Sequence, residues 1–395
     1  MSVDWTQLPK ELVDIISKKL TIYGDYLRFQ AVCRTWRSSV PSIPTHLPPQ
    51  LPWLMLPKSQ SRLQPRRAFF DLSNHKVHIL NLSEAASRKR SCGSSHGWLV
   101  LLDETPEVIL LNPLSRAKLF LPPLSSFPNV IAFNYSHIGR EYLLLLLSSG
   151  DRYTRNLRQM RDYFIKKVVL SSSPGMDTGF FALAILNQTG DLAYCRNGDN
   201  CWRLIEGLLS YCEDVIFFKG SFYAVDKYGT IMVCDLRGYT PKISIVETPR
   251  QLGGDMQYLV GLGDELLLVT RYLDLELDFE PSRQNLIFRT NRFEVFRLDA
   301  SGLQWERILN LGDNMIFVGE NSSLSFSASD FPGCTGNCVY YTDDYSYTND
   351  GVFIEPDLGI YRLSDGSIEP LPCYPANSFY GLQWPPPIWI TPNPC

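Results

Sequence analysis

The chain has 395 residues, of which 45% are hydrophobic and 12% aromatic, so it can bury a large core and is not a disordered chain. Its 37 basic and 41 acidic side chains give a formal net charge of −4, which argues against nucleic-acid binding, because that function needs a clustered basic excess. The length exceeds one small domain and fits a small module joined to a large one.

Charged residues interrupt the N-terminal segment, and no run of about 18 uncharged apolar residues occurs, so we expect no signal peptide and no membrane partner. The protein is expected in the cytoplasm, the nucleus or both. The 10 cysteines follow no repeated spacing, which in a reducing compartment indicates core residues and free thiols. Cys334 and Cys338 are four apart, but no second pair follows at zinc spacing, so no metal or other cofactor is expected.

The first periodic stretch predicts an amphipathic helix, because its apolar residues recur at i, i+3, i+4 and i+8. The residues of this apolar stripe are Leu12, Ile15, Ile16 and Leu20. Gly24 and Asp25 then interrupt the pattern, and Asp25 is a suitable N-cap for a second short helix.

A further helix, or a continuation of the second, is predicted by the four-residue spacing of Val32, Trp36 and Val40, and Pro41 ends it. Helices this short bury little apolar surface, so we expect part of the stripe to face another protein. The alternative is a helical cap that packs on the rest of its own chain.

Residues 41–57 are proline-dense, which excludes a helix and favours extended geometry. We assign 44–57 to a linker with few long-range contacts, although 53–56 is apolar enough to be a strand of the next domain. From residue 58 to 395 the chain consists of short apolar runs separated by Gly, Asn, Asp, Ser and Pro, which is typical of an all-β domain.

One unit recurs loosely in this domain: a Gly-led strand, a turn, a second strand ending near Asp or Asn, and a third strand. Sheets of a few strands repeated every 40 to 60 residues, roughly, are typical of propeller blades. We therefore predict a small all-α module followed by an all-β propeller of six or seven blades, with seven slightly favoured, since roughly 340 residues are available at about 50 per blade. The apolar segment 384–394 is expected to close the ring with residues 53–82.

Residues 4–43 closely resemble the F-box in both halves. The matching residues are Leu8, Pro9, Glu11, Leu12, Ile15, Ile16 and Leu20, then Arg28, Phe29, Val32, Cys33, Arg34, Trp36 and Arg37. The resemblance implies docking on a Skp-type adaptor and, through it, on a cullin. The residues that it implies for this interface are Leu8, Pro9, Leu12, Ile15, Ile16, Leu20, Val32, Cys33 and Trp36. Trp36 could equally belong to the internal core of the helices.

Residues 58–395 resemble the plant KIB-type kelch-like beta-propeller, most clearly at 220–236 and 385–394. Together the two resemblances imply a non-catalytic subunit of an SCF-type cullin-RING ubiquitin ligase, whose propeller captures an unknown protein substrate. The alternative is a propeller enzyme or small-ligand sensor with a vestigial F-box.

Two segments of unusual composition are candidates for contact with that substrate. The basic segment 152–167 carries Arg155, Arg158 and Arg161, whose guanidinium groups suit an acidic or phosphorylated partner; a solvated surface is the ordinary alternative. The acidic, aromatic segment 343–357 carries Tyr345 and Tyr347, which offer rigid contact area; a long hairpin loop is the alternative. No motif of nucleophile, base or metal ligands supports catalysis, so no catalytic residue is predicted.

Overall fold

The computed structural model describes most of the chain. The described residues are 4–42, 44, 46–57, 66–83, 89–175, 179–206, 211–238, 240–246, 253–280, 283–299, 304–344, 357–373 and 386–393. Among them, no helix combines the length and the apolar character that crossing a membrane requires.

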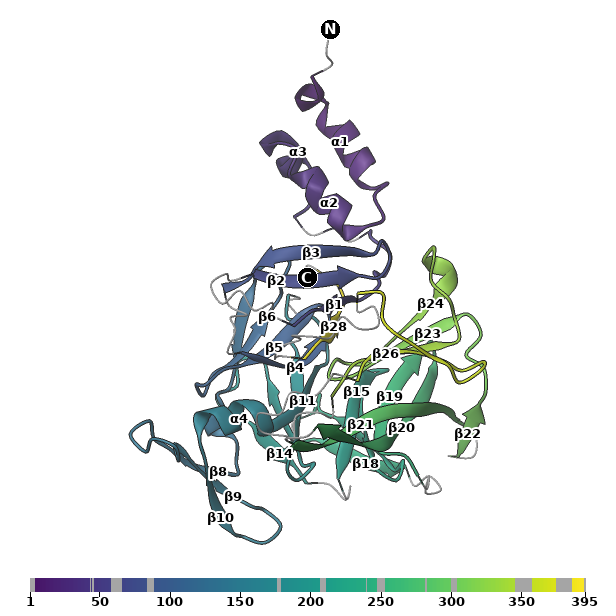
Figure 1. Cartoon of the computed structure of the whole chain (residues 1–395). Coiled ribbons are helices and arrows are strands. Elements are labelled where there is room, and N and C mark those ends of the chain that lie inside the picture. The colour runs from purple at the N-terminus through teal and green to yellow at the C-terminus, as the bar shows by residue number, and fades with distance from the viewer. Residues whose placement is uncertain are drawn as a thin grey trace.

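Short helices form the N-terminal module, which stands at one end of the molecule (Figure 1). They are η1 (Trp5–Gln7), α1 (Lys10–Ser17), α2 (Tyr23–Gln30) and α3 (Arg34–Ser39). The predicted break at Gly24 and Asp25 is wrong, because α2 begins at Tyr23 and both residues lie in its first turn. Asp25 does not cap the helix. Its carboxylate pairs with Arg28 and, in the first turn, interacts favourably with the positive end of the helix dipole.

The module has a core of its own. The buried residues are Val13, Tyr26, Phe29, Trp36 and Val40. The rings of Phe29 and Trp36 lie 4.5 Å apart, and the indole N–H of Trp36 donates to the carbonyl of Trp5 at 3.1 Å. Of the two roles left open for Trp36, the structure supports the internal one.

The segment after the helices lies against them. The hydroxyl of Tyr26 donates to the Pro41 carbonyl at 2.7 Å, and a ring nitrogen of His46 lies 3.1 Å from the Ser17 carbonyl. Gln50 also bonds to the loop before α2. The expectation of few long-range contacts here is wrong, because the proline-rich chain folds back instead of extending away.

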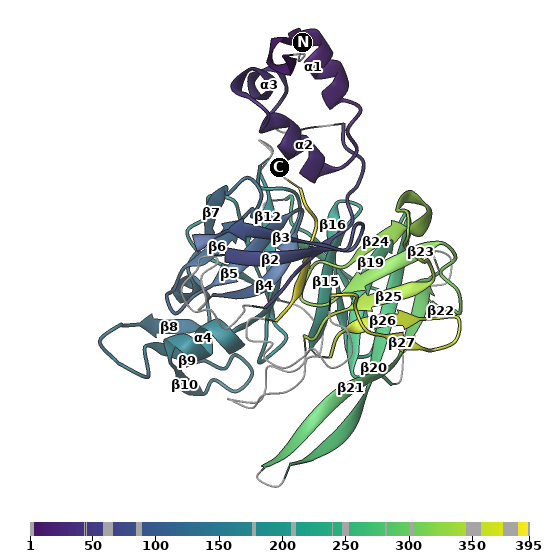
Figure 2. The same cartoon turned by 45° about the horizontal axis from the view of Figure 1, so that its top comes forward.

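Six sheets form the propeller ring (Figures 1 and 2). The first is β28 (Ile388–Ile390), β1 (Trp53–Met55), β2 (Arg66–Asp71) and β3 (Lys76–Asn81); the second is β4 (Arg90–Ser95), β5 (Trp98–Leu102), β6 (Val108–Leu111) and β7 (Lys118–Leu121). The third is β11 (Ile165–Leu170), β12 (Phe181–Leu186), β13 (Leu192–Arg196) and β14 (Arg203–Ile205); the fourth is β15 (Cys212–Phe218), β16 (Ser221–Asp226), β17 (Ile231–Asp235) and β18 (Lys242–Val246).

The fifth and sixth blades complete the ring. The fifth is β19 (Met256–Leu262), β20 (Glu265–Glu280), β21 (Arg283–Leu298) and β22 (Trp305–Ile308); the sixth is β24 (Leu324–Ser327), β23 (Asn314–Val318), β25 (Cys338–Tyr341), β26 (Gly359–Arg362) and β27 (Ile368–Glu369). Single turns η3 (Leu124–Ser126) and η4 (Ala328–Asp330) lie between strands. Strands such as β5 and β6 are buried throughout, because neighbouring blades cover both faces of a sheet.

The C-terminal strand closes the ring, as predicted. Strand β28 pairs antiparallel with β1, with Ile390 opposite Trp53, and β1 pairs with β2 on its other side. Trp389 is buried with Leu54 in a core that also contains Phe317 of the sixth blade. The predicted linker 44–57 therefore extends too far, because its residues 53–55 form the propeller strand β1.

A seventh sheet lies outside the ring (Figures 1 and 2). It consists of β8 (Val130–Phe133), β9 (Tyr142–Leu145) and β10 (Arg152–Arg155), and α4 (Leu157–Tyr163) follows. We call β8, β9, β10 and α4 the side lobe. The described residues form six blades, so the preference for seven is wrong. That estimate divided the whole length by the length of one blade and so included the residues of the side lobe.

Candidate partner-binding surfaces

The first candidate surface is on α1. Leu12, Ile15 and Ile16 are 46%, 53% and 40% exposed, whereas Val13 and Ser17 are buried against the other helices. Three of the four residues of the stripe read from the sequence thus lie on the outside of the module, and the fourth, Leu20, packs against its core. These exposed apolar side chains, three and four residues apart on one side of α1, make the helix a candidate interaction surface.

The other residues predicted for this interface divide by burial. Val32 is 52% exposed and Pro9 is also exposed. Packed against the helical core and half-buried are Leu8, Leu20 and Cys33. The sulfur of Cys33 accepts from the Trp36 N–H at 3.4 Å and caps α3, so this residue supports the module from within. We call Leu12, Ile15 and Ile16, the exposed apolar residues of α1, the apolar helix surface.

The basic segment 152–167 is not a loop, because it forms β10, α4 and the start of β11. Asn156 and Gln159 form a capping box at the start of α4, a signal that the sequence contains. The Arg155 guanidinium donates to the side-chain oxygen of Gln188 at 3.2 Å. Arg158 is 67% exposed, with Nε 3.6 Å from a carboxylate oxygen of Asp162.

Arg161 was predicted as a surface charge and is instead buried. Its guanidinium donates to both oxygens of Asp162, at 2.7 and 2.9 Å, and to Glu104 in the β5–β6 turn at 2.8 Å. The same correction applies to Lys167, whose amine is buried 2.6 Å from Asp214. Arg161 attaches the side lobe to the second blade, and Lys167 joins the third blade to the fourth, so neither group is available to a partner.

The acidic segment 343–357 also differs from the expectation. Tyr345 and Tyr347 lie outside the described residues. Asp344 and Asp357 are described, and both bind the buried guanidinium of Arg271, at 3.0 and 2.8 Å. The ends of this segment are therefore held inside the fifth and sixth blades by ion pairs.

Arg271 is a structural centre that the sequence analysis missed. Its Nε donates to the Thr290 hydroxyl at 2.8 Å, and the Tyr258 hydroxyl donates to Asp344 at 3.0 Å. The signal was present, because an arginine stands inside the apolar run of β20. A charge at such a position needs a buried partner.

A second buried pair joins the second and sixth blades. Arg90 on β4 donates to Glu320 at 2.6 Å and to the carbonyls of Asp162 and Ile165 at 2.7 and 3.0 Å. Burial raises the pKa of the Glu320 carboxyl, and the guanidinium of Arg90 opposes that shift. Both side chains are buried and engaged with each other.

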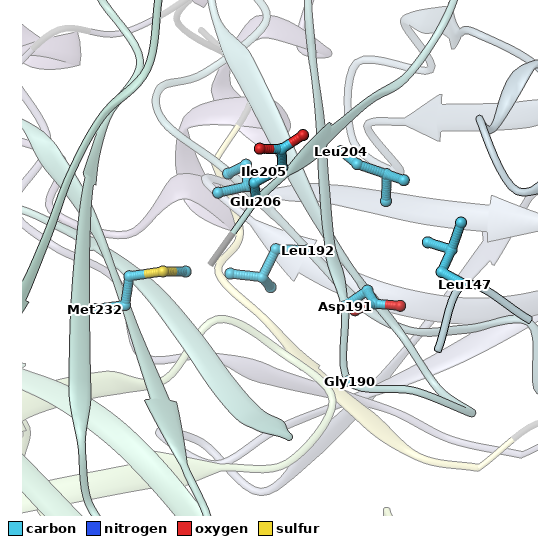
Figure 3. Close-up of a pocket in the computed structure, with 8 residues that line it drawn as sticks. All are labelled: Leu147, Gly190, Asp191, Leu192, Leu204, Ile205, Glu206 and Met232. Carbon is cyan, nitrogen blue, oxygen red and sulfur yellow. The ribbon is translucent and has the colours of Figure 1, made fainter. Parts of the chain in front are cut away.

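A cavity of about 280 Å³ lies where the turn after β9 meets the third and fourth blades (Figure 3). Its lining residues are Leu147, Gly190, Asp191, Leu192, Leu204, Ile205, Glu206 and Met232. Asp191 and Glu206 are the charged residues of this lining, and the sequence around them contains no catalytic or phosphate-binding motif. In the described part of the chain, no group of three or more His, Cys, Asp and Glu side chains is placed to hold a metal ion.

Comparison with known proteins gives the family. Residues 69–362 match the family model of the KIB1-4 beta-propeller. The chain is 32% identical to the F-box protein SKIP23 of Arabidopsis thaliana, over 98% of this chain and 96% of that protein. It is 27% identical to the Arabidopsis F-box protein At2g17036, over 98% and 95%, and 24% identical to the F-box/kelch-repeat protein At1g64840, over 92% of each. The chain therefore belongs to the plant F-box proteins that carry a KIB1-4 beta-propeller.

Proposed function

We propose that this chain is the non-catalytic substrate-recognition subunit of an SCF-type cullin-RING ubiquitin ligase. In this role the helical module binds a Skp-type adaptor, which connects to a cullin, and the propeller captures a protein substrate. The observation that carries the proposal is the apolar helix surface, which stays exposed on a module whose core is complete without it.

The energetics support an interface at this surface. Fully burying an isoleucine or leucine side chain contributes about 1.5–3 kcal/mol, so covering the exposed halves of Leu12, Ile15 and Ile16 would yield a few kcal/mol. Anchors of this type carry much of the binding free energy of a protein interface. The F-box relatives support the same assignment.

The arrangement of the chain is compatible with two simultaneous partners. The helical module is at one end of the molecule, while the side lobe and the long β20–β21 hairpin project at the other (Figure 2). A protein bound to α1 would leave those projections accessible. That separation suits a receptor that holds its adaptor and its substrate at once.

The test is the affinity of the full chain for a purified plant Skp-type adaptor. Ile15→Asp with Ile16→Asp should weaken binding about 30-fold or more, because truncated hot-spot anchors cost about 2 kcal/mol or more. Ile79→Asp is the matched control, since Ile79 is 63% exposed on β3, outside the helical module. Unchanged adaptor affinity in the double variant, with melting like that of the parent, would refute the proposal.

A further inference from the structure

The side lobe is firmly anchored on the ring. On its inner side, Tyr142 and Leu144 are fully buried in the core of the second and third blades, and Phe133 packs against that core. The buried Arg161 of α4 adds an ion pair to Glu104, whose side chain is partly exposed. The outer parts of the lobe are thus presented on a rigid support, which lowers the entropy cost of binding a partner.

Strand β10 is one edge of the lobe sheet, whose order is β10, β9, β8. In both views β10 lies on the side away from β8 (Figures 1 and 2). The Leu146 N–H donates to the Asp151 carbonyl at 2.8 Å. Leu146 and Asp151 are therefore a hydrogen-bonded pair, and the register of β9 and β10 then shows which of the following pairs are hydrogen-bonded. Because hydrogen-bonded and non-hydrogen-bonded pairs alternate, Tyr153 bonds to β9, whereas the N–H and C=O groups of Arg152 and Thr154 point to the free edge.

The charges on this edge lack carboxylate partners. Within the described residues, neither Arg152 nor Arg155 lies within ion-pair distance of an acid; Arg155 reaches only the Gln188 amide and the ring of Tyr153, 5.6 Å away. The neighbouring carboxylate of Asp151 accepts from Ser149 at 2.7 Å. Several exposed or half-exposed arginines of the ring blades, by contrast, do pair with a carboxylate, as in Arg203–Asp199, Arg297–Glu265 and Arg362–Glu369.

We propose that the free edge of β10 binds an extended acidic segment of a substrate protein as an added strand. The outward N–H and C=O groups of Arg152 and Thr154 supply main-chain hydrogen bonds, which give affinity in strand addition. Arg152 and Arg155 are three residues apart and lie on opposite faces of β10, so their guanidinium groups supply charge-assisted bonds to carboxylates on both faces of the added segment, which select acidic side chains. The inference rests on the proposed function only in naming the bound protein a substrate.

The test uses a fluorescent peptide of about ten residues with a repeating Glu-Glu-Thr-Thr pattern, which places glutamates three apart and on both faces of an extended strand and covers the four residues of β10. Its binding to the full chain is measured by anisotropy beside two counterparts. One has lysine in place of glutamate, and the other is N-methylated at alternate residues so that it cannot pair with an edge. We expect binding of the first peptide and loss of binding for both counterparts.

Variants locate the contact. Arg152→Glu with Arg155→Glu should weaken the acidic peptide about tenfold or more, because two charge-assisted contacts become repulsive. Thr154→Pro should also weaken it, since proline removes an edge N–H without removing a bond to β9. The matched control is Arg140→Glu, which changes an exposed arginine between β8 and β9 of the same lobe and should leave affinity unchanged.

Several outcomes would overturn the inference: equal binding of the N-methylated or the lysine peptide, no binding of the acidic peptide, or an unaltered affinity in the double variant. A dimer in sedimentation velocity that Thr154→Pro dissociates would instead identify a second copy of the chain as the occupant. Adaptor binding by the same preparation separates the two proposals. If the adaptor binds and the acidic peptide does not, only the edge inference fails; if the peptide binds and the adaptor does not, only the ligase role fails.

Discussion

The side-chain oxygen of Gln50 accepts a hydrogen bond from the N–H of Tyr23 at 3.1 Å, at the first residue of α2. The amide nitrogen of Gln50 donates to the Thr21 carbonyl at 2.9 Å. Leu51, the next residue, is buried in the core shared by the first and sixth blades. Adjacent residues of the chain are thus fixed to the helical module and to the propeller, which couples the orientations of the two.

We expect Gln50→Ala to loosen this coupling. Loss of the acceptor should speed amide hydrogen exchange at Tyr23 about fivefold to tenfold, because one hydrogen bond contributes about 1 kcal/mol. Small-angle scattering should show a broader distribution of distances, while melting of the propeller stays unchanged. Gln7→Ala is the control, since Gln7 is exposed on η1. Unaltered exchange and scattering in Gln50→Ala would contradict the coupling.

Ring closure predicts where the propeller can be cut. A chain of residues 51–395 keeps β1 between β28 and β2 and should melt in one cooperative transition. A chain of residues 58–395 lacks β1, so β28 loses its neighbour and the first blade is broken. We expect this shorter chain to be insoluble or to melt without cooperativity. Identical melting of the two chains would show that β1 does not hold the ring together.

Loss of the buried cation at position 271 should be strongly destabilising. Arg271→Met leaves the carboxylates of Asp344 and Asp357 buried without their cation, which should lower the free energy of unfolding by about 3–5 kcal/mol. Arg203→Ala is the control. The ion pair between Arg203 and Asp199 is half-exposed and should contribute about 1 kcal/mol or less to the free energy of unfolding. Urea unfolding measures both variants. Equal losses would mean that the Arg271 cluster does not stabilise the fold.

Thiol reactivity provides a test with a defined pH dependence. Burial raises the pKa of Cys92 and of Cys234 to about 12, whereas Cys201 is exposed. Iodoacetamide at pH 8 should therefore modify Cys201 well before the two buried thiols, as read by peptide mass spectrometry. Modification of all three at one rate in the native chain would contradict this burial.

The same shifts predict a loss of stability in alkali. The folded chain keeps its protons on Cys92 and Cys234 above pH 9, where the unfolded chain loses them. The unfolded state then binds fewer protons, so the free energy of unfolding falls as the pH rises from about 9 towards 12. Cys234→Ser should reduce this fall in urea titrations at pH 8 and 10. A fall equally steep in the variant would show that Cys234 does not cause it.

The sequence by itself determined the features that depend on local pattern. The spacing of Leu12, Ile15 and Ile16 indicates an apolar stripe, and in the structure that stripe is exposed, because residues three and four apart share one side of a helix. The apolar segment at Trp389 was likewise recognisable as a closing strand, since a propeller needs a strand from one end of the chain to complete its first blade. Family resemblance in the same residues indicated the F-box.

Tertiary structure decided which charges are buried and how many blades there are. Arg161 and Arg155 belong to one basic segment in the sequence, yet only Arg161 reaches Glu104, which lies on the second blade. Burial of a charge depends on partners supplied by distant parts of the chain, and residue spacing does not encode those partners. The blade count was decided in the same way, because the side lobe consists of ordinary strands that pack outside the ring, and only packing distinguishes them from a blade.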